Sequence, residues 1–266
     1  MNTVLSSDGT TIGYSRDGSG PALILVGGAF QHRAIDPRTG QLAALLARDL
    51  TVYHYDRRGR GESGDTAPYA KEREIEDLAA LVEHAGGPAL VFGNSSGAAL
   101  ALDAAAHGVA ISKLAVYEAP FVVDGSRPPV GEDYLDRLSK LLADGRRGDA
   151  VELFLTEAVG VPAEFVAGMR QAPFWPDFEA VAPTVRYDAL FMDGTLTGGP
   201  LPAERWAGVT VPVLVIDGGA SPESMHSAAS ALAALLPDAG RHTIEGQLHD
   251  VDPALLAPVL HEFFAN

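Results

Sequence analysis

Two adjacent serines lie between two glycines in Gly93-Asn94-Ser95-Ser96-Gly97, which follows an apolar run and precedes an alanine-rich stretch. A serine hydroxyl is a weak nucleophile and needs a neighbouring base, and a sharp, strained turn is one way to expose it. The two glycines leave room for a strand and a helix to approach each other closely at such a turn. This pattern predicts a turn that presents Ser95 for attack on a substrate. The alternative is a tight turn of small residues that has no chemical role.

The elements that position this turn follow from the hydrophobic pattern. Nearly continuous apolar runs, each ending in Gly, Pro or a small polar residue, are typical of strands that are buried on both faces of a parallel sheet. Helical patterns lie between these runs, and a more polar, hairpin-like pair comes before them at residues 3–20. This alternation predicts an α/β fold with a doubly wound, mostly parallel sheet. The predicted strands lie in residues 21–28, 50–59, 88–95, 113–120, 211–219 and 240–246.

Residues 122–206 interrupt the alternation, because they contain no run typical of a strand. Residues 132–145, 147–160 and 162–171 look helical, and a cluster of proline and aromatic residues follows them. We therefore predict a core formed by residues 1–121 and 207–266, with a helical cap, residues 122–206, inserted between two strands of the sheet.

The composition narrows the classes of partner and cofactor. The 266 residues are 47% hydrophobic and 20% charged, with a formal net charge of −16 and no cysteine. Such an acidic surface repels nucleic acids and anionic membranes, so the expected partner is a small molecule. No dinucleotide-binding motif or metal-ligand spacing occurs, so we predict no cofactor and no metal. No signal peptide or long apolar run is seen, which predicts a cytoplasmic protein; a homodimer is left open.

Four motifs give the chain a resemblance to the α/β-hydrolases over essentially its whole length. Residues 93–97 fit G-x-S-x-G between a strand and a helix, which is the context of a nucleophile elbow. Residues 25–30, "LVGGAF", lie where that family has its oxyanion loop, and residues 55–64, "YDRRGRGESG", are similar to its D-x-R-G-x-G-x-S signature. Residues 245–251, "EGQLHDV", place a histidine between the last strand and the terminal helix.

The resemblance implies a role for each of these positions. Ser95 would be the nucleophile and His249 its base. The backbone N–H groups of Ala29 and Ser96 would form the oxyanion hole. We interpret Asp56, Arg57 and Arg58 as structural residues that tie their loop to neighbouring backbone by charged hydrogen bonds.

The acid of the triad is where the sequence departs from the commonest family pattern. Many relatives carry an aspartate a few residues after the strand at 211–219, but this chain has Ser221 at about that place. Three carboxylates could replace it: Glu118, Glu223 and Asp217. We favour Glu118, because it is a lone carboxylate at the end of an apolar strand, where a buried charge requires a partner. Its alternative role is a structural hydrogen bond, while Glu223 could stabilise a helix N-terminus and Asp217 a turn.

These residues predict a serine hydrolase that cleaves a small to medium apolar ester, lactone or similar acyl substrate through an acyl-enzyme. The same constellation also supports carbon–carbon bond hydrolysis or peracid formation, and a non-catalytic ligand-binding protein is a further alternative. Near the elbow, Phe30 and His32 are candidates to line the substrate pocket. Aromatic and sulfur-containing side chains could line it as well or form the core of the cap; these are Phe121, Phe174, Trp175, Phe178, Phe191 and Met192.

Overall fold

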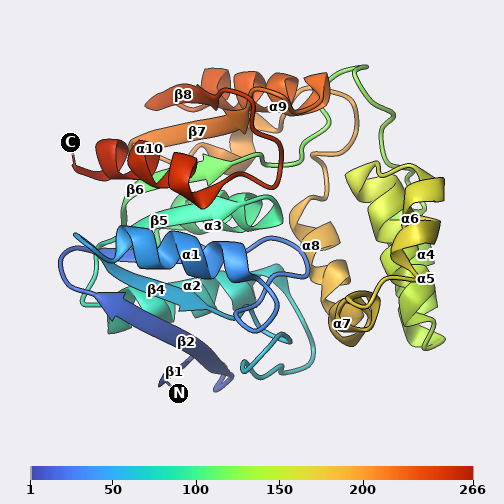
Figure 1. The fold of residues 1–266 in the computed structure, drawn as a ribbon, viewed down its shortest axis with the longest axis horizontal. Coiled ribbons are helices and arrows are strands. Elements are labelled where there is room, and N and C mark those ends of the chain that lie inside the picture. The colour runs from blue at the N-terminus through green and yellow to red at the C-terminus, as the bar shows by residue number, and fades with distance from the viewer. Residues whose placement is uncertain (1, 266) are drawn as a thin grey trace.

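The computed structural model, which describes residues 2–265, contains an eight-stranded sheet in the order β1-β2-β4-β3-β5-β6-β7-β8 (Figure 1). The pairs β1–β2 and β2–β4 are antiparallel, and all later pairs are parallel, so the predicted mostly parallel sheet is confirmed. The strands are β1 (Asn2–Leu5), β2 (Thr11–Gly18), β3 (Ala22–Val26), β4 (Thr51–Tyr55), β5 (Ala89–Asn94), β6 (Ile111–Tyr117), β7 (Val213–Gly218) and β8 (Ala239–Ile244).

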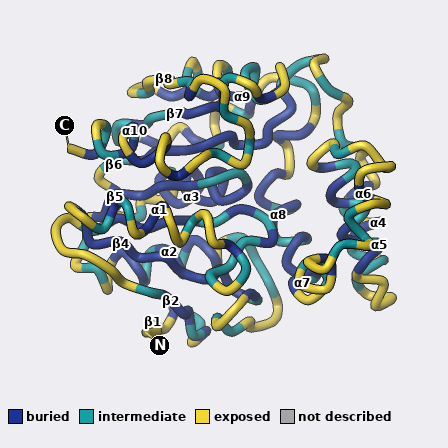
Figure 2. Tube along the Cα trace, viewed as in Figure 1, coloured by how far each residue is buried: buried dark blue, intermediate teal, exposed yellow. Residues whose placement is uncertain are grey.

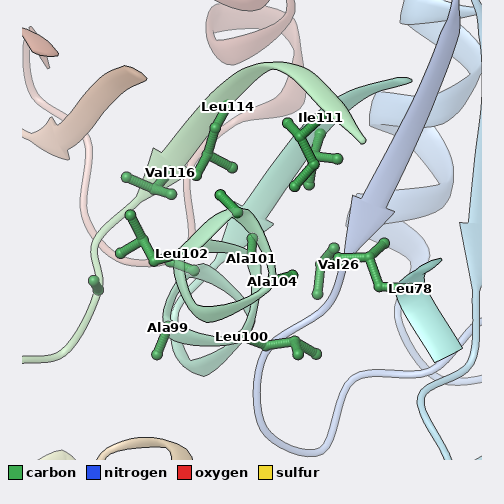
Figure 3. Packing of buried hydrophobic residues seen from close by; sticks show 14 of the residues in the cluster. Val26, Leu78, Ala99, Leu100, Ala101, Leu102, Ala104, Ile111, Leu114 and Val116 are labelled. Carbon is green, nitrogen blue, oxygen red and sulfur yellow. The ribbon is translucent and has the colours of Figure 1, made fainter. Parts of the chain in front are cut away.

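Helices cover both faces of the sheet, because alternate strand residues point to opposite sides. In β5, Ala89 and Val91 pack with α2, α3 and α9, whereas Leu90 and Phe92 pack with α1 and α10. Figure 2 shows the buried strands between these layers, and Figure 3 shows how the alanine-rich α3 packs against neighbouring strands. These helices are α1 (Pro37–Leu46), α2 (Lys71–His84), α3 (Ser96–Ala106), α9 (Glu223–Leu235) and α10 (Pro253–Ala265).

Between β6 and β7 the chain forms helices and, within the described residues, no strand. Figure 1 shows α4 to α7 beside the sheet, with α8 between them and the sheet. This segment has an apolar cluster of its own, which also contains Phe30 from the loop after β3. Its helices are α4 (Tyr134–Ala143), α5 (Arg147–Leu153), the π-helical η1 (Phe154–Val159), α6 (Ala163–Met169), α7 (Trp175–Val181), the 3₁₀ turn η2 (Ala182–Thr184), α8 (Val185–Phe191) and the 3₁₀ turn η3 (Ala203–Trp206).

The sequence pattern did not show α7, which begins in the cluster of proline and aromatic residues. Pro176 lies in the first turn of this helix, where a missing backbone N–H costs nothing, so the proline starts the helix and does not break it. Among the described residues, no helix has the length and hydropathy needed to cross a membrane.

Candidate active site

Ser95 lies at a strained turn between the end of β5 and the start of α3. Its backbone has φ 55° and ψ −125°, values that a non-glycine residue rarely adopts. A Cβ atom added to Gly97 would lie 2.3 Å from the carbonyl oxygen of Val26, and one added to Gly93 would lie 2.7 Å from the Cα of Ala98. Glycine is therefore needed on both sides of Ser95 for the strand and the helix to come this close.

Glu118 and His249 are brought together, although 131 positions separate them in the sequence. The Nδ1 atom of His249 lies 2.7 Å from Oε2 of Glu118, whose carboxylate is buried. A carboxylate can only accept a hydrogen bond, so Nδ1 carries the proton, and Nε2 of a neutral ring is free to accept one. The pair therefore has the orientation that a general base needs.

The second oxygen of the Glu118 carboxylate is also held. Its Oε1 atom accepts hydrogen bonds from the backbone N–H of Gly218 at 2.9 Å and from the Ser221 hydroxyl at 2.6 Å. Ser221, which follows β7, thus donates to a carboxylate at the end of the neighbouring strand β6. Glu118 itself has φ 44°, a second strained backbone position at this site.

The other two candidate carboxylates lie elsewhere. Asp217 is fully buried and accepts two hydrogen bonds from Arg241, at 3.0 and 2.9 Å, and one from Thr243. Its remaining partner is Nδ1 of His226, at 2.5 Å. Glu223 is exposed at the first residue of α9. Of the three candidates, only Glu118 contacts His249 within the described residues.

The loop that carries His249 is fixed by the end of β6 and by the loop after β7. The hydroxyl of Tyr117 donates to the carbonyl oxygen of Leu248 at 2.6 Å, and the N–H of Ala220 donates to the carbonyl of Gln247 at 2.8 Å. The side chain of His249 is 41% exposed. Among residues 2–265, the His249 side chain is hydrogen-bonded to Glu118, and no hydrogen bond joins it to Ser95 Oγ.

The loop after β3 lies against the elbow. A Cβ atom added to Gly28 would be 2.8 Å from the Cβ of Ser95, so the two backbones are in contact. The N–H of Gly28 donates to Oε1 of Gln31, while that of Ala29 has no protein acceptor within residues 2–265. Ser96 is the first residue of α3, where backbone N–H groups lack partners within the helix. The N–H of Ala29, in the loop that lies against Ser95, and that of Ser96, at the start of α3, are therefore the candidate donors of an oxyanion hole.

Two pocket candidates, Phe30 and His32, lie on this loop. Phe30 stacks on Phe178, with ring centroids 4.4 Å apart, and so joins the loop to the helices after β6. His32 is half-buried, and its Nδ1 atom is buried without a partner among the described residues. Burial lowers the pKa of His32, so its ring is neutral at pH 7.

The remaining aromatic candidates lie mainly in apolar cores. Phe121 is 1% exposed and stacks on Trp206, which places it in the core around α3. Trp175 is buried in the cluster of the helices after β6, and its Nε1 donates to Glu179 at 2.8 Å. These two positions favour the alternative of core packing. Phe191 and Met192 are also buried, whereas Phe174 is exposed.

A buried ion-pair cluster beneath the elbow was missed at the level of the sequence. Asp188 of α8 accepts hydrogen bonds from Arg57 at 2.6 Å, Arg60 at 2.5 Å and the hydroxyl of Ser96 at 2.7 Å. Arg57 also forms an ion pair with Glu74 of α2. Burial by itself raises the pKa of Asp188, but Arg60 and Arg57 hold that pKa below its ordinary value, so the carboxylate is charged. The sequence signal for this cluster was Asp188, the one carboxylate within α8.

Two of the surface hollows formed by residues 2–265 bear on the site. A groove of about 530 Å³ lies beside α9, with Asp124, Pro200, His226 and Arg241 among its lining residues, and Ser95 is not one of them. A cleft of about 40 Å³ borders His249, Gln31 and Asn94, and this volume suits about one water molecule. The described residues contain no group of His, Cys, Asp and Glu side chains that could hold a metal ion.

Comparisons with known proteins identify the family of the chain. The model of the alpha/beta hydrolase family matches residues 23–258. The crystal structure of an alpha/beta hydrolase from Sphaerobacter thermophilus DSM 20745 is 56% identical, with a TM-score of 0.90, and the match covers 99% of this chain and 100% of that one. No curated protein matches the chain.

More distant structures share the fold. An esterase from Rhodococcus sp. ECU1013 is 21% identical, with a TM-score of 0.66 over 100% of this chain and 98% of that one. A meta-cleavage product hydrolase from Pseudomonas fluorescens IP01 is 18% identical, with the same TM-score and the same coverage. The family model and the Sphaerobacter structure together establish that the chain belongs to the alpha/beta hydrolase family.

Proposed function

We propose that this protein is a serine hydrolase that cleaves a small to medium apolar ester, lactone or similar acyl substrate through an acyl-enzyme. The observation that carries the proposal is the hydrogen bond between Glu118 and His249. Ser95 is held at a strained turn, and its N–H donates to the carbonyl of Tyr117, the residue before Glu118. Membership of a hydrolase family supports it, and the distant structural neighbours include an esterase.

In the proposed mechanism, Ser95 Oγ attacks the substrate carbonyl while Nε2 of His249 takes the hydroxyl proton. Glu118 stabilises the imidazolium that forms, and the N–H groups of Ala29 and Ser96 stabilise the oxyanion. His249 then gives its proton to the leaving alcohol. Water, activated by the same histidine, hydrolyses the acyl-enzyme and regenerates Ser95.

We propose that residues 122–206 form a cap over the site and select the substrate. The stacking of Phe30 on Phe178 supports this role, because it places an apolar contact between the oxyanion loop and the cap. The apolar cluster around Phe30 favours an apolar acyl group. A cytoplasmic location and a homodimer stay predictions from the sequence.

Covalent labelling tests the proposal directly. A fluorophosphonate should label the folded protein at Ser95, and labelling should be lost in Ser95→Ala. Turnover of p-nitrophenyl acetate should vanish in Ser95→Ala and survive in Ser96→Ala, because the latter keeps the backbone N–H and loses only the hydroxyl contacts with Asp188 and Arg57.

The outcome also separates the alternatives. A folded wild-type protein that neither reacts with the probe nor hydrolyses any ester or lactone would be a ligand-binding member of the fold. Labelling at Ser95 in a protein that hydrolyses only carbon–carbon bonds, or forms only peracids, would support the proposed triad. It would contradict the proposed class of substrate.

A further inference from the structure

The peptide group between Gly28 and Ala29 is held at its carbonyl end only. Nη1 of Arg60 donates to the carbonyl oxygen of Gly28 at 2.5 Å, while the Ala29 N–H has no acceptor within residues 2–265. In a planar trans peptide the carbonyl and the N–H point in opposite directions. Fixing the carbonyl of Gly28 therefore fixes the direction of the Ala29 N–H.

The neighbouring peptide group, between Gly27 and Gly28, is held at both ends. Nη1 of Arg57 donates to the carbonyl of Gly27 at 3.3 Å, and the N–H of Gly28 donates to Gln31. Phe30, two residues on, has φ 63°, which is unfavourable for an aromatic residue. The surroundings must hold a loop with such a residue in place, because the loop would otherwise relax.

Arg60 is itself immobilised by three kinds of contact. Besides Gly28, its guanidinium donates to Asp188 at 2.5 Å and to the hydroxyl of Thr184 at 2.9 Å, and the residue is 1% exposed. Arg57 and Arg60 face Glu74 and Asp188, so the positive and negative charges of the cluster balance. A balanced, fully hydrogen-bonded buried cluster defines one geometry, whereas removing a single partner leaves a buried charge.

We propose that Arg60, held by Asp188, is a positioning residue that keeps the Gly28–Ala29 peptide turned so that its N–H is available to the oxyanion. This inference rests on the proposed function. Arg57 and Arg60 occupy variable positions of the D-x-R-G-x-G-x-S signature, so the signature itself does not specify them. Because Asp188 and Thr184 belong to the segment between β6 and β7, Arg60 links the helices after β6 to the geometry of the oxyanion hole.

The test compares Arg60→Lys with Arg58→Lys. The two arginines lie in one loop and are both buried, but Arg58 pairs with Asp77 and Asp8, and neither pair touches the loop after β3. A lysine at either position keeps the positive charge but lacks the several N–H donors of the planar guanidinium group. A merely structural role predicts similar effects of the two substitutions, so the difference between them isolates the positioning role.

For an ester that the wild-type protein hydrolyses, Arg60→Lys should lower kcat by about tenfold to a hundredfold, less than the loss of a whole oxyanion donor. KM should change by less than about threefold, because the contact acts in the transition state. Affinity for a trifluoromethyl ketone, which forms an oxyanion when Ser95 adds to it, should fall by the same factor as kcat/KM. Arg58→Lys should lower the Tm and leave kcat and the ketone affinity within about threefold of wild type.

Equal kcat values in the two lysine variants would overturn the inference while leaving the proposed function intact. A wild-type protein that a fluorophosphonate fails to label would overturn both. If Arg60→Lys does not fold, Thr184→Val keeps every charge and removes the acceptor of Arg60 Nε, together with a local hydrogen bond to the carbonyl of Val181. A lower kcat in this variant at unchanged KM supports the assignment, and an unchanged kcat contradicts it.

Discussion

At the scale of single residues, the site depends on how the two oxygens of Glu118 are shared. One oxygen takes both fixed donors, Gly218 N–H and the Ser221 hydroxyl, and the other is left for His249. A buried carboxylate is costly unless such donors replace the water that it loses. The arrangement gives Ser221 a structural role, because its hydroxyl supports a carboxylate at the end of the neighbouring strand.

Glu118→Gln should lower kcat by about 10²–10⁴-fold, because the amide cannot stabilise the imidazolium or enforce the productive tautomer. Ester hydrolysis by the purified variant measures the effect, with Tm as a check on folding. Glu223→Gln is the matched control and should leave kcat nearly unchanged, since Glu223 is exposed at the start of α9. The opposite ranking would transfer the role of the acid to Glu223.

Adding Ser221→Asp to Glu118→Gln should restore part of the lost activity. The Ser221 side chain lies within hydrogen-bond distance of the Glu118 carboxylate, so an aspartate there brings a negative charge back to the same place. The measure is kcat of the double variant against that of Glu118→Gln alone. Ser221→Asn in the same background adds no charge, and an equal recovery with asparagine would show that charge is not what His249 requires.

At the scale of elements, the elbow depends on the close approach of α3 to the loop after β3. Gly97→Ala should destabilise the protein by several kcal/mol or prevent folding, because its Cβ would lie 2.3 Å from one backbone oxygen and 2.6 Å from another. Gly40→Ala is the control: nothing lies within 4 Å of its Cβ, and alanine in a helix is more stable by about 0.5–1 kcal/mol. Urea unfolding of both variants should therefore give shifts of opposite sign.

The elements of the sheet could be predicted from the sequence because each is encoded locally. The apolar runs and the G-x-S-x-G turn lie within short windows, and β3, β4, β5, β6, β7 and β8 are found where those runs were. The sequence favoured Glu118 as the partner of His249, because Glu118 is a lone carboxylate at the end of an apolar strand. The cluster around Asp188 could not be predicted, because its arginines lie more than 120 positions away and only packing brings them together.

At the scale of the whole molecule, burial of neutral histidines makes stability depend on pH. Burial lowers the pKa of His54 in β4 and of His32, so the unfolded chain binds more protons than the folded one between those lowered values and the ordinary pKa near 6.5. The free energy of unfolding is therefore expected to fall as the pH drops below about 6.5. His54→Phe should show a smaller decrease in Tm between pH 8 and pH 5.5 than the wild-type protein. Parallel slopes would contradict this origin.

The partial exposure of the His249 ring bears on what becomes of the acyl group. With 41% of its side chain exposed, the proposed base is in contact with solvent. We expect dissolved alcohols or hydroxylamine to compete with water for the acyl-enzyme in proportion to their concentration. Under such conditions the proposed active site would act as an acyltransferase. The ratio of ester or hydroxamate to free acid would then measure how readily dissolved nucleophiles reach the acyl-enzyme.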